Sequence, residues 1–405
     1  MAERTGPLDG VRVVDMTTSY AGPTASMYLA DLGATVIKVE RPGRGDDARH
    51  WGPPFDGGTS AWFASANRNK QSVVIDVRDE LGREALGRLL DGADVFLQNV
   101  NPAKLARLGI DADTLRARNP RLVYCALSGF GLDGPDRDLA GYDLVAQARS
   151  GLMSVTGAQG GTPQRVSTAL SDIASGMAAA IAISAALVRQ RDRGEGEVID
   201  VSLLETDLAL MAPRIAAFHA GEALPAPSGG TDSVLALYQS FETADRTIVV
   251  AVGNDAMWLR FCGVVGLEDL AADLALRDNA GRRAQRQRII EAVAARLVTR
   301  TAREWLDDLA GAEVPAAPVQ TLADVVSDPH VVARGSVLPV PGSDGRLVSV
   351  RSPFRLASVP PRNERFPGLG DDTRSVMLDL GYDGDDLARL TAGSPAAPTT
   401  AGAGS

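Results

Sequence analysis

The feature that most constrains this chain is a strand–loop–helix–strand pattern at its N-terminal end. Residues 11–15 contain two adjacent valines and predict a short buried strand. A loop over residues 16–22 follows, and Pro23 suits the first turn of a helix that ends before Gly33. Residues 34–40 (ATVIKVE) predict a second strand. This βαβ unit implies a parallel sheet with a right-handed crossover.

The same alternation continues through the N-terminal third. Further strands are predicted over residues 72–77, 94–99 and 122–127, with helices over residues 80–90 and 103–108. The fold class is therefore α/β, with a Rossmann-like parallel sheet. Ligands of such sheets bind where the strands end in loops.

The composition of the chain changes after this region. We expect a large Rossmann-like domain over residues 1–220, then a linker and a smaller α+β domain over residues 221–330. A return segment over residues 331–392 includes a hairpin at 336–353, and residues 393–405 are low in complexity and predict a flexible tail. In the smaller domain we expect a strand over residues 247–252 and helices over residues 256–266, 282–298 and 302–309.

Two cysteines and three histidines in 405 residues restrict the chemistry. They provide no disulfide framework, zinc-finger spacing or iron–sulfur motif, so we expect no metal. A nucleophile or base in this chain is then a carboxylate, a hydroxyl or a lysine.

Charge and targeting signals narrow the partners and the compartment. The chain has 41 Lys and Arg against 51 Asp and Glu, a net charge of −10, which argues against nucleic acid and anionic membranes. The N-terminal eight residues lack the pattern of a signal peptide. The uncharged run over residues 173–188 is shorter than the roughly 20 residues of a membrane span, so it predicts a buried helix. We expect a cytoplasmic protein.

The loop after the first strand carries only Gly22 where a dinucleotide fingerprint needs three glycines, which disfavours NAD and FAD. Arg41 and Arg78 follow two predicted strands, and Arg107 lies in a short helix after another. Arginine forks bind phosphates in bidentate geometry, so together they suggest a phosphate-binding edge. For any one of them alone, a solvated surface arginine is the favoured interpretation.

Two aspartates are candidates for acyl chemistry. Asp172 directly precedes the uncharged run, where it is either an N-cap or a nucleophile that the helix dipole keeps ionised. Asp143 follows Tyr142 after a glycine-rich turn region, and it either supports the first carboxylate or is a solvated loop residue. Spacing alone does not separate these interpretations.

An ordered set of motifs resembles the family III CoA-transferases (CaiB/BaiF family), whose members include formyl-CoA:oxalate and carnitine CoA-transferases. The motifs lie between about residues 8 and 390, and the following carry the resemblance: LDGVRVVD (8–15), AGP (21–23), VIKVERPG (36–43), SGFG (128–131), GYD (141–143), Asp172 with Gly176, GEGEVIDVSL (194–203) and DPH (328–330).

The resemblance implies that CoA moves from an acyl-CoA donor to a carboxylic acid acceptor through an aspartyl-CoA thioester. Asp172 matches the catalytic aspartate, with Tyr142 and Asp143 expected to orient the acyl group. CoA and acyl-CoA are expected as substrates, without a permanently bound cofactor, and an interlocked homodimer is expected. The positions that match CoA contacts, or adjoin them, are Ser19, Tyr20, Ala21, Arg41, Ile75, Arg78, Asn99, Arg107 and Leu108.

Two other functions remain open. Related 2-methylacyl-CoA racemases or epimerases carry a His–Asp pair, whereas Tyr142 precedes Asp143 here. A racemase needs a base on each face of the α-carbon, so transfer is favoured. A non-catalytic acyl-CoA-binding protein is the third possibility. Oxalate-type transferases also carry Gln where this chain has Tyr20, and four glycines where it has Gly229 and Gly230.

Overall fold

The computed structural model describes residues 6–392 except 57, 342, 344, 345, 361 and 365. Within these limits the chain divides into two compact units. The first comprises residues up to Leu152, Val166–His219 and the chain from Ala333 on, and the second comprises Met153–Arg165 and Ala220–Val332. The segment Met153–Arg165 thus packs with the smaller unit, although it precedes the predicted boundary at residue 220. The predicted tail, 393–405, lies outside the described residues.

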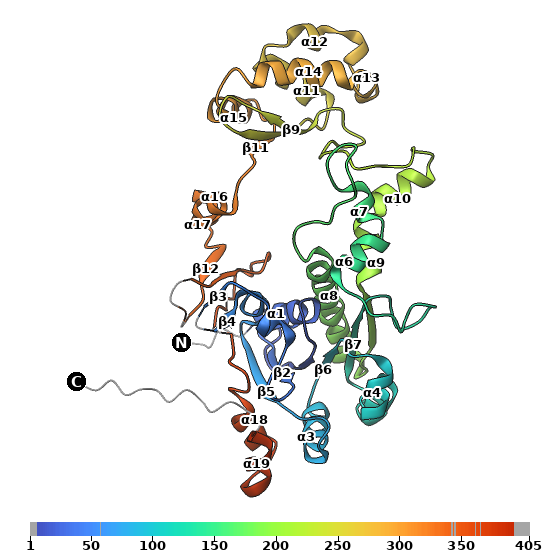
Figure 1. Ribbon diagram of the computed structural model, residues 1–405, viewed down its shortest axis with the longest axis vertical. Coiled ribbons are helices and arrows are strands. Elements are labelled where there is room, and N and C mark those ends of the chain that lie inside the picture. The colour runs from blue at the N-terminus through green and yellow to red at the C-terminus, as the bar shows by residue number, and fades with distance from the viewer. Residues whose placement is uncertain are drawn as a thin grey trace, which may run out of the picture. The chain divides into compact units, whose positions relative to one another are not determined.

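A six-stranded parallel sheet forms the centre of the first unit (Figure 1). Its spatial order is β5 (Lys70–Val74), β2 (Thr35–Glu40), β1 (Arg12–Met16), β6 (Val95–Gln98), β7 (Val123–Ser128) and β8 (Val198–Ser202). Numbered along the chain, this order is 3-2-1-4-5-6, the doubly wound order of dinucleotide-binding folds. The predicted α/β class and parallel sheet are therefore confirmed. The order reverses between β1 and β6, and ligands of such sheets bind at that point.

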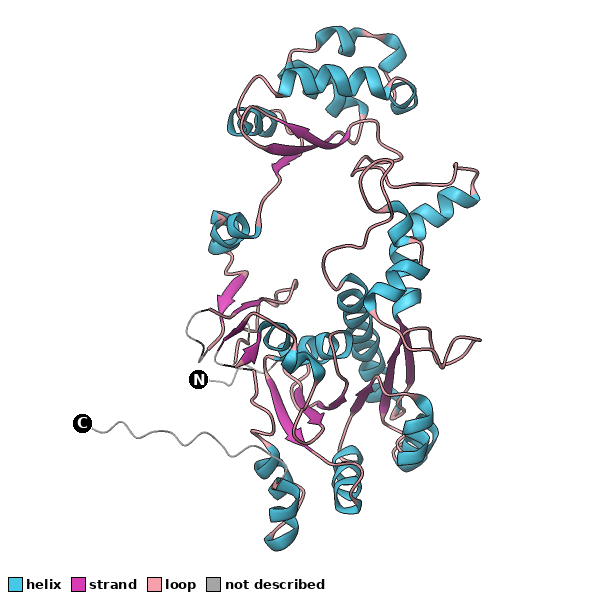
Figure 2. Ribbon diagram, viewed as in Figure 1, coloured by secondary structure: helices cyan, strands magenta, loops and turns pink. Residues whose placement is uncertain are grey.

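Helices cover both faces of the sheet (Figure 2). Alternate strand residues face opposite cores, so Val13 packs in one core and Val14 in the other. One face carries α1 (Ala21–Asp31) and α8 (Leu170–Arg193). The other carries α3 (Glu80–Asp91), α4 (Pro102–Leu108), α5 (Ala112–Arg118), α18 (Thr373–Asp379) and α19 (Gly384–Thr391).

The remaining elements of the first unit lie in its connections and its return segment. They are η1 (Asp47–His50), β3 (Phe55–Asp56), β4 (Thr59–Ser60), α2 (Ala61–Asn67), α6 (Asp143–Arg149), α7 (Leu152–Val155, whose last three residues belong to the second unit), α9 (Leu203–Leu210) and α10 (Ala212–His219). In the return segment, β12 (Val337–Pro339) pairs antiparallel with β13 (Val348–Val350), which confirms the predicted hairpin, although parts of its turn lie outside the described residues.

The helix α8 differs most from the prediction, because it has 24 residues and begins before Asp172. Arg191 and Arg193 extend it beyond the uncharged run, since Arg favours helices and its charge suits a helix C-terminus. Gly194, in the left-handed conformation, ends it. By length and composition this helix is able to cross a membrane, but it packs on α1, β7 and β8.

The second unit is an α+β structure built on an antiparallel sheet in the order β11 (Ala316–Pro318), β10 (Thr247–Ala251) and β9 (Tyr238–Glu242). Trp258 and Trp305 are buried in its core. The predicted helix over residues 282–298 is two helices, α13 (Asn279–Ala284) and α14 (Arg286–Leu297). The other elements are α11 (Asp255–Val265), α12 (Glu268–Ala272), η2 (Leu274–Leu276), α15 (Ala302–Gly311), α16 (Leu322–Ser327) and α17 (Pro329–Ala333, whose last residue belongs to the first unit).

Close packing of α1 against α8 predicts the effect of a substitution at Gly176. A Cβ atom there would lie 2.7 Å from the Ala21 carbonyl oxygen and 2.8 Å from the Thr24 Cβ. We therefore expect Gly176→Ala to lower the free energy of unfolding by about 1–3 kcal/mol, as overpacking does. Gly87→Ala in α3, whose Cβ would meet nothing closer than 3.9 Å, is the control. It is expected to stabilise by about 0.5–1 kcal/mol. Urea unfolding of both variants checks this prediction. A change in the free energy of unfolding that has the same sign in both variants would contradict it.

Candidate active site

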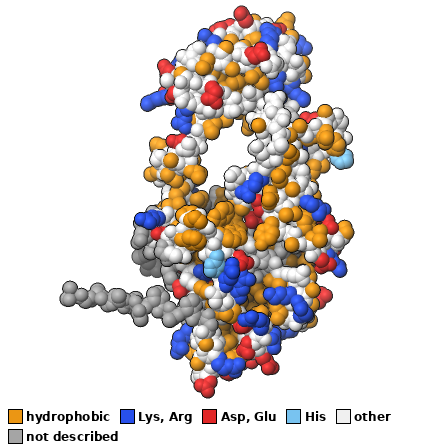
Figure 3. Space-filling view, in the orientation of Figure 1, with side chains coloured by type: hydrophobic (Ala, Val, Ile, Leu, Met, Phe, Trp, Pro, Cys, Tyr) orange, Lys and Arg blue, Asp and Glu red, His pale blue; other side chains and the backbone are white. Residues whose placement is uncertain are grey.

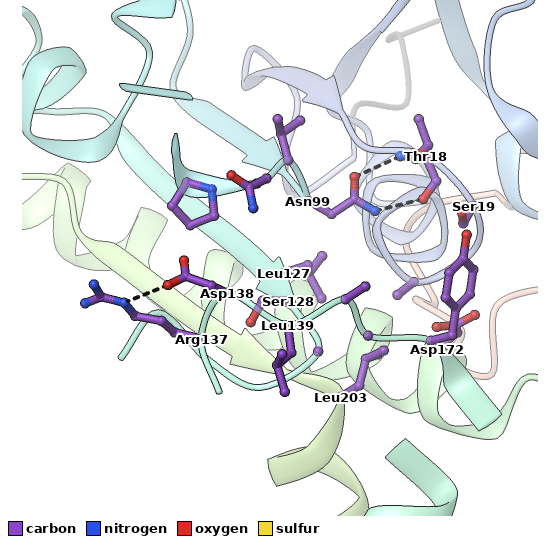
Figure 4. A pocket seen from close by; sticks show the side chains of 18 residues that line it. Thr18, Ser19, Asn99, Leu127, Ser128, Arg137, Asp138, Leu139, Asp172 and Leu203 are labelled. Atoms are coloured by element: carbon purple, nitrogen blue, oxygen red, sulfur yellow. Dashed lines mark hydrogen bonds and ion pairs between the residues drawn. The ribbon is translucent and has the colours of Figure 1, made fainter. Parts of the chain in front are cut away.

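A cavity of about 330 Å³ opens at the carboxyl edge of the sheet, where the strand order reverses. Its wall comes from the loops that follow β1, β6, β7 and β8 and from the first turn of α8 (Figure 4). Among the described residues that line it, Arg137 is the one cationic residue, and Figure 4 shows it well separated from Asp172 across the cavity. Arg137 Nε lies 3.5 Å from Asp138 Oδ2, so a paired guanidinium and the separate carboxylate of Asp172 share this hollow at the ligand-binding edge.

The loop after β1 is fixed in an unusual conformation. Ser19 has a φ of 73°, which is uncommon for a residue other than glycine. Its N–H donates to Asp46 Oδ1 at 2.9 Å. One residue earlier, the Thr18 N–H donates to Asn99 Oδ1 at 3.1 Å, and Asn99 Nδ2 donates to the Thr18 carbonyl at 2.9 Å (Figure 4). Asn99 therefore joins the loops after β1 and β6.

A buried group of charges lies beneath this loop. Lys38 Nζ lies 2.8 Å from Asp46 Oδ2 and donates to the Thr17 carbonyl at 2.9 Å. Lys70 Nζ lies 3.4 Å from Asp15 Oδ2. Burial acts to raise the pKa of Asp15, but the two lysines outweigh it and lower that pKa. Burial lowers the pKa of Lys70 to about 7, against the attraction of Asp15.

Asp172 lies in the first turn of α8 and is not the N-cap, which is Ala169. The Ser171 N–H, an orphan donor of this helix end, is satisfied by Asp143 instead, whose Oδ1 accepts it at 2.8 Å. No described residue donates a hydrogen bond to the Asp172 carboxylate, which faces the cavity. Burial, then Asp143 and Asp207, raise the pKa of Asp172 to about 7. We expected the helix dipole to keep this carboxylate ionised. Burial and the two nearby carboxylates oppose the dipole and favour the protonated form.

The two other residues expected beside Asp172 lie close to it. Asp143 begins α6 and accepts Gln147 Nε2 at 2.7 Å, so it is not a solvated loop residue. Tyr142 lines the cavity at its exposed rim. A close crossing of the chain positions both, because a Cβ on Gly129 would lie 2.5 Å from the Gly141 Cα. Among the described residues, no group of three His, Cys, Asp or Glu side chains has the arrangement of a metal site.

The expected CoA contacts divide into two sets. Ser19, Ala21 and Asn99 line the cavity. Tyr20 lies close enough to Asp172 for the two groups to interact electrostatically. The Tyr20 hydroxyl lies 2.8 Å from Ser65 Oγ. Burial, helped by Asp172, raises the pKa of Tyr20.

The other expected contacts lie outside the cavity lining. Arg41 pairs with Asp47, and Arg78 makes two 2.8 Å bonds to Asp76, which lower the pKa of that aspartate to about 2. Arg107 is exposed and pairs with no carboxylate among the described residues, while the Ile75 and Leu108 side chains pack in a core cluster. All three arginines follow strands at the carboxyl edge, and Figure 3 shows Lys and Arg side chains gathered in several groups on the face drawn.

Three residues that shape this site were not predicted from the sequence. Lys38 interrupts an apolar strand, which is an available signal of a buried charge. Asp207 gives no such signal, because it follows two other polar residues, Glu205 and Thr206, in α9. Ser171 carries no distinguishing pattern, because its role depends on two helices distant in sequence, α6 and α9.

The comparisons with known proteins agree with this geometry. The model of CoA-transferase family III matches residues 8–373. Succinate–glutarate CoA-transferase of Agrobacterium fabrum is 36% identical over 94% of this chain and 97% of the relative. Acetyl-CoA:oxalate CoA-transferase of Acetobacter aceti is 34% identical over 91% of this chain and 96% of the relative.

A solved structure extends the agreement to the fold. The crystal structure of a CaiB/BaiF family protein from Brucella suis superposes with a TM-score of 0.82 and 35% identity, covering 93% of this chain and all of that one. The family match, the relatives and the fold agree over nearly the whole chain. The chain therefore belongs to CoA-transferase family III, and it is a CoA-transferase.

Proposed function

We propose that this CoA-transferase moves CoA from an acyl-CoA donor to a small carboxylic acid through an aspartyl-CoA thioester on Asp172. The observation that carries the proposal is an unpaired carboxylate that faces a cavity at the switch point of the sheet. A hydrogen-bonded carboxylate would be a weaker nucleophile, whereas Asp172 has no donor among the described residues.

The proposed steps balance without any other reactant. An Asp172 carboxylate oxygen attacks the thioester carbonyl, the C–S bond breaks, and CoA thiolate leaves with the electron pair. The thiolate then attacks Cγ of Asp172 in the mixed anhydride, which releases the donor acid and leaves aspartyl-CoA thioester. The acceptor carboxylate repeats the exchange in reverse and regenerates Asp172. Covalent catalysis of this kind divides one hard exchange into easier steps.

The surroundings of Asp172 support this chemistry. The chain crossing at Gly129 and Gly141 brings backbone to the cavity wall, where N–H groups are available to an oxyanion. Arg137, across the cavity, complements an anionic substrate. Because relatives are named for succinate, glutarate and oxalate, we propose succinyl-CoA with small dicarboxylates as the first pairs to assay.

We also propose a cytoplasmic homodimer with interlocked chains. The outer face of α8 exposes Ile181 by 70% and Val188 by 61%, one above the other at a seven-residue spacing. Adjacent exposed apolar side chains are typical of a surface that a partner covers. Both cysteines are free and buried, in keeping with a reducing compartment.

Loss of Asp172 tests the covalent step. With acyl-CoA and hydroxylamine, mass spectrometry is expected to find a hydroxamate on Asp172 in the wild type. Asp172→Asn, a nearly isosteric change, should lower kcat on the order of 10⁴-fold or more, because the nucleophile is gone. Asp192→Asn, at an exposed position in the last turn of the same helix, is the matched control and should retain activity within about twofold. Full activity in Asp172→Asn, or an adduct elsewhere, would overturn the assignment.

The pKa of Asp172 predicts the pH profile. With that pKa near 7, about half of the free enzyme carries the ionised nucleophile at neutral pH. As pH falls below 7 the group is protonated, so kcat/KM should fall, approaching tenfold per pH unit below about pH 6, and it should level off above about pH 8. Initial rates from pH 5 to 9 measure this profile. A flat profile down to pH 5 would contradict it.

The dimer proposal predicts a mass change. We expect the wild type to sediment as a dimer and the double variant Ile181→Lys, Val188→Lys to shift toward monomer, since two charges would be buried. Leu274→Lys, at a side chain 82% exposed in the second unit, is the control and should leave the mass unchanged. Analytical ultracentrifugation distinguishes these outcomes, and a monomeric wild type at micromolar concentration would refute the dimer.

A further inference from the structure

Ser171 is held between two carboxylates that belong to different helices. Its N–H donates to Asp143 Oδ1 at 2.8 Å, and its hydroxyl donates to Asp207 Oδ2 at 2.8 Å. Asp143 begins α6, and Asp207 lies in α9, both of which pack against α8. Because Asp172 is the next residue, these two bonds fix the backbone from which its carboxylate projects.

Asp207 is an unusual residue for its position. It is completely buried, and its Oδ1 has no hydrogen-bond partner among the described residues. It forms no ion pair with any described Lys or Arg. A buried carboxylate without a cation is unfavourable, and an apolar side chain at this position would avoid that cost. The residue therefore reduces stability without a structural gain on its own helix.

The charged groups that face Asp207 from the packed helices are carboxylates. Burial raises the pKa of Asp207, the Ser171 bond opposes this, and Asp143 adds to it, while the Ser150 hydroxyl lies close enough to lower it. In turn Asp207 is one of the two carboxylates that raise the pKa of Asp172. Three aspartates thus repel one another around the first turn of α8.

We propose that Asp207 is a positioning residue of the transfer reaction, which holds the first turn of α8 through Ser171 and, by repulsion, drives Asp172 toward its acylated, uncharged state. This rests on the proposed acylation of Asp172. When Asp172 becomes an anhydride or thioester its negative charge leaves with the thiolate or the released acid, so the repulsion from Asp143 and Asp207 is relieved in that step. The buried carboxylate raises the energy of the free nucleophile more than that of the intermediate.

Asp207→Asn separates charge from hydrogen bonding, because asparagine Oδ1 still accepts from the Ser171 hydroxyl. We expect the acid limb of kcat/KM to move down by roughly half a pH unit or more, as removal of a nearby like charge does. The fraction of enzyme trapped as aspartyl-CoA thioester at a fixed acyl-CoA concentration should also fall. Glu205→Gln removes an exposed charge from the same helix and should change neither quantity.

Ser171→Ala tests the positioning part separately. It removes the hydroxyl bridge and keeps every charge, so kcat should fall by about tenfold while KM changes little, since small misplacements of reacting groups slow catalysis. If Asp207→Asn does not fold, Asp207→Ser removes the charge together with the bridge, and its comparison with Ser171→Ala, which removes the bridge alone, gives the effect of the charge.

A titration that needs no turnover separates this inference from the proposed function. Carboxyl ¹³C NMR of aspartate-labelled protein follows Asp172, which is identified by the signal that Asp172→Asn removes. A lower titration midpoint in Asp207→Asn but not in Glu205→Gln supports the inference even if no hydroxamate forms. An unchanged midpoint, or an unchanged thioester fraction in an active Asp207→Asn enzyme, overturns it.

Discussion

The buried ion pair between Lys38 and Asp46 is the interaction on which the site depends. Both side chains are completely buried, and breaking such a pair by removing one partner costs about 3–5 kcal/mol. Lys38 comes from the centre of β2 and also bonds the Thr17 carbonyl, while Asp46 holds the Ser19 N–H. One pair therefore joins the sheet to the loop that follows its first strand. The loop keeps its left-handed Ser19 because this pair and Asn99 hold it from two sides.

The position of that loop then determines what α8 contributes. Gly176 allows α8 to approach α1 so closely that a Cβ there would overlap Ala21 and Thr24, and Gly22 allows α1 to pack against Thr17 of the preceding loop. This approach brings the start of α1 beside the first turn of α8, where Asp172 projects. Cations are thus buried under the loop after β1, whereas carboxylates are buried behind the nucleophile. The α8 dipole favours an ionised Asp172, whereas burial, and then Asp143 and Asp207, favour the neutral form and raise the pKa of Asp172 to about 7.

Sequence patterns predicted the fold well because the sheet is repetitive. Each strand is a short apolar run before a turn, and those runs predicted a parallel sheet that binds ligands at its strand ends, whereas the order of the strands comes from the structure. Sequence patterns also singled out Asp172 and the first loop, and the family resemblance added Asn99, all of which lie at the cavity. They did not predict the start of α8, because Asp143, distant in sequence, satisfies the end of that helix in place of an N-cap. The roles of Lys38 and Asp207 were missed for a similar reason, because the residues they contact are not adjacent in sequence and are brought near only by the fold.

Three unfavourable features of the first unit lie around the cavity and the loop after β1. Ser19 is in a conformation that side chains rarely adopt, Asp207 has a buried oxygen without a donor, and Lys70 is buried with its pKa lowered to about 7. The unit carries others away from the cavity, since Asn69 also has a positive φ of 63° and the Tyr382 hydroxyl is buried without a hydrogen-bond partner among the described residues. Strain that stability alone would remove persists where it serves a reaction. The buried Asp207 fits that pattern, because its repulsion of Asp172 is relieved only when the nucleophile gives up its charge.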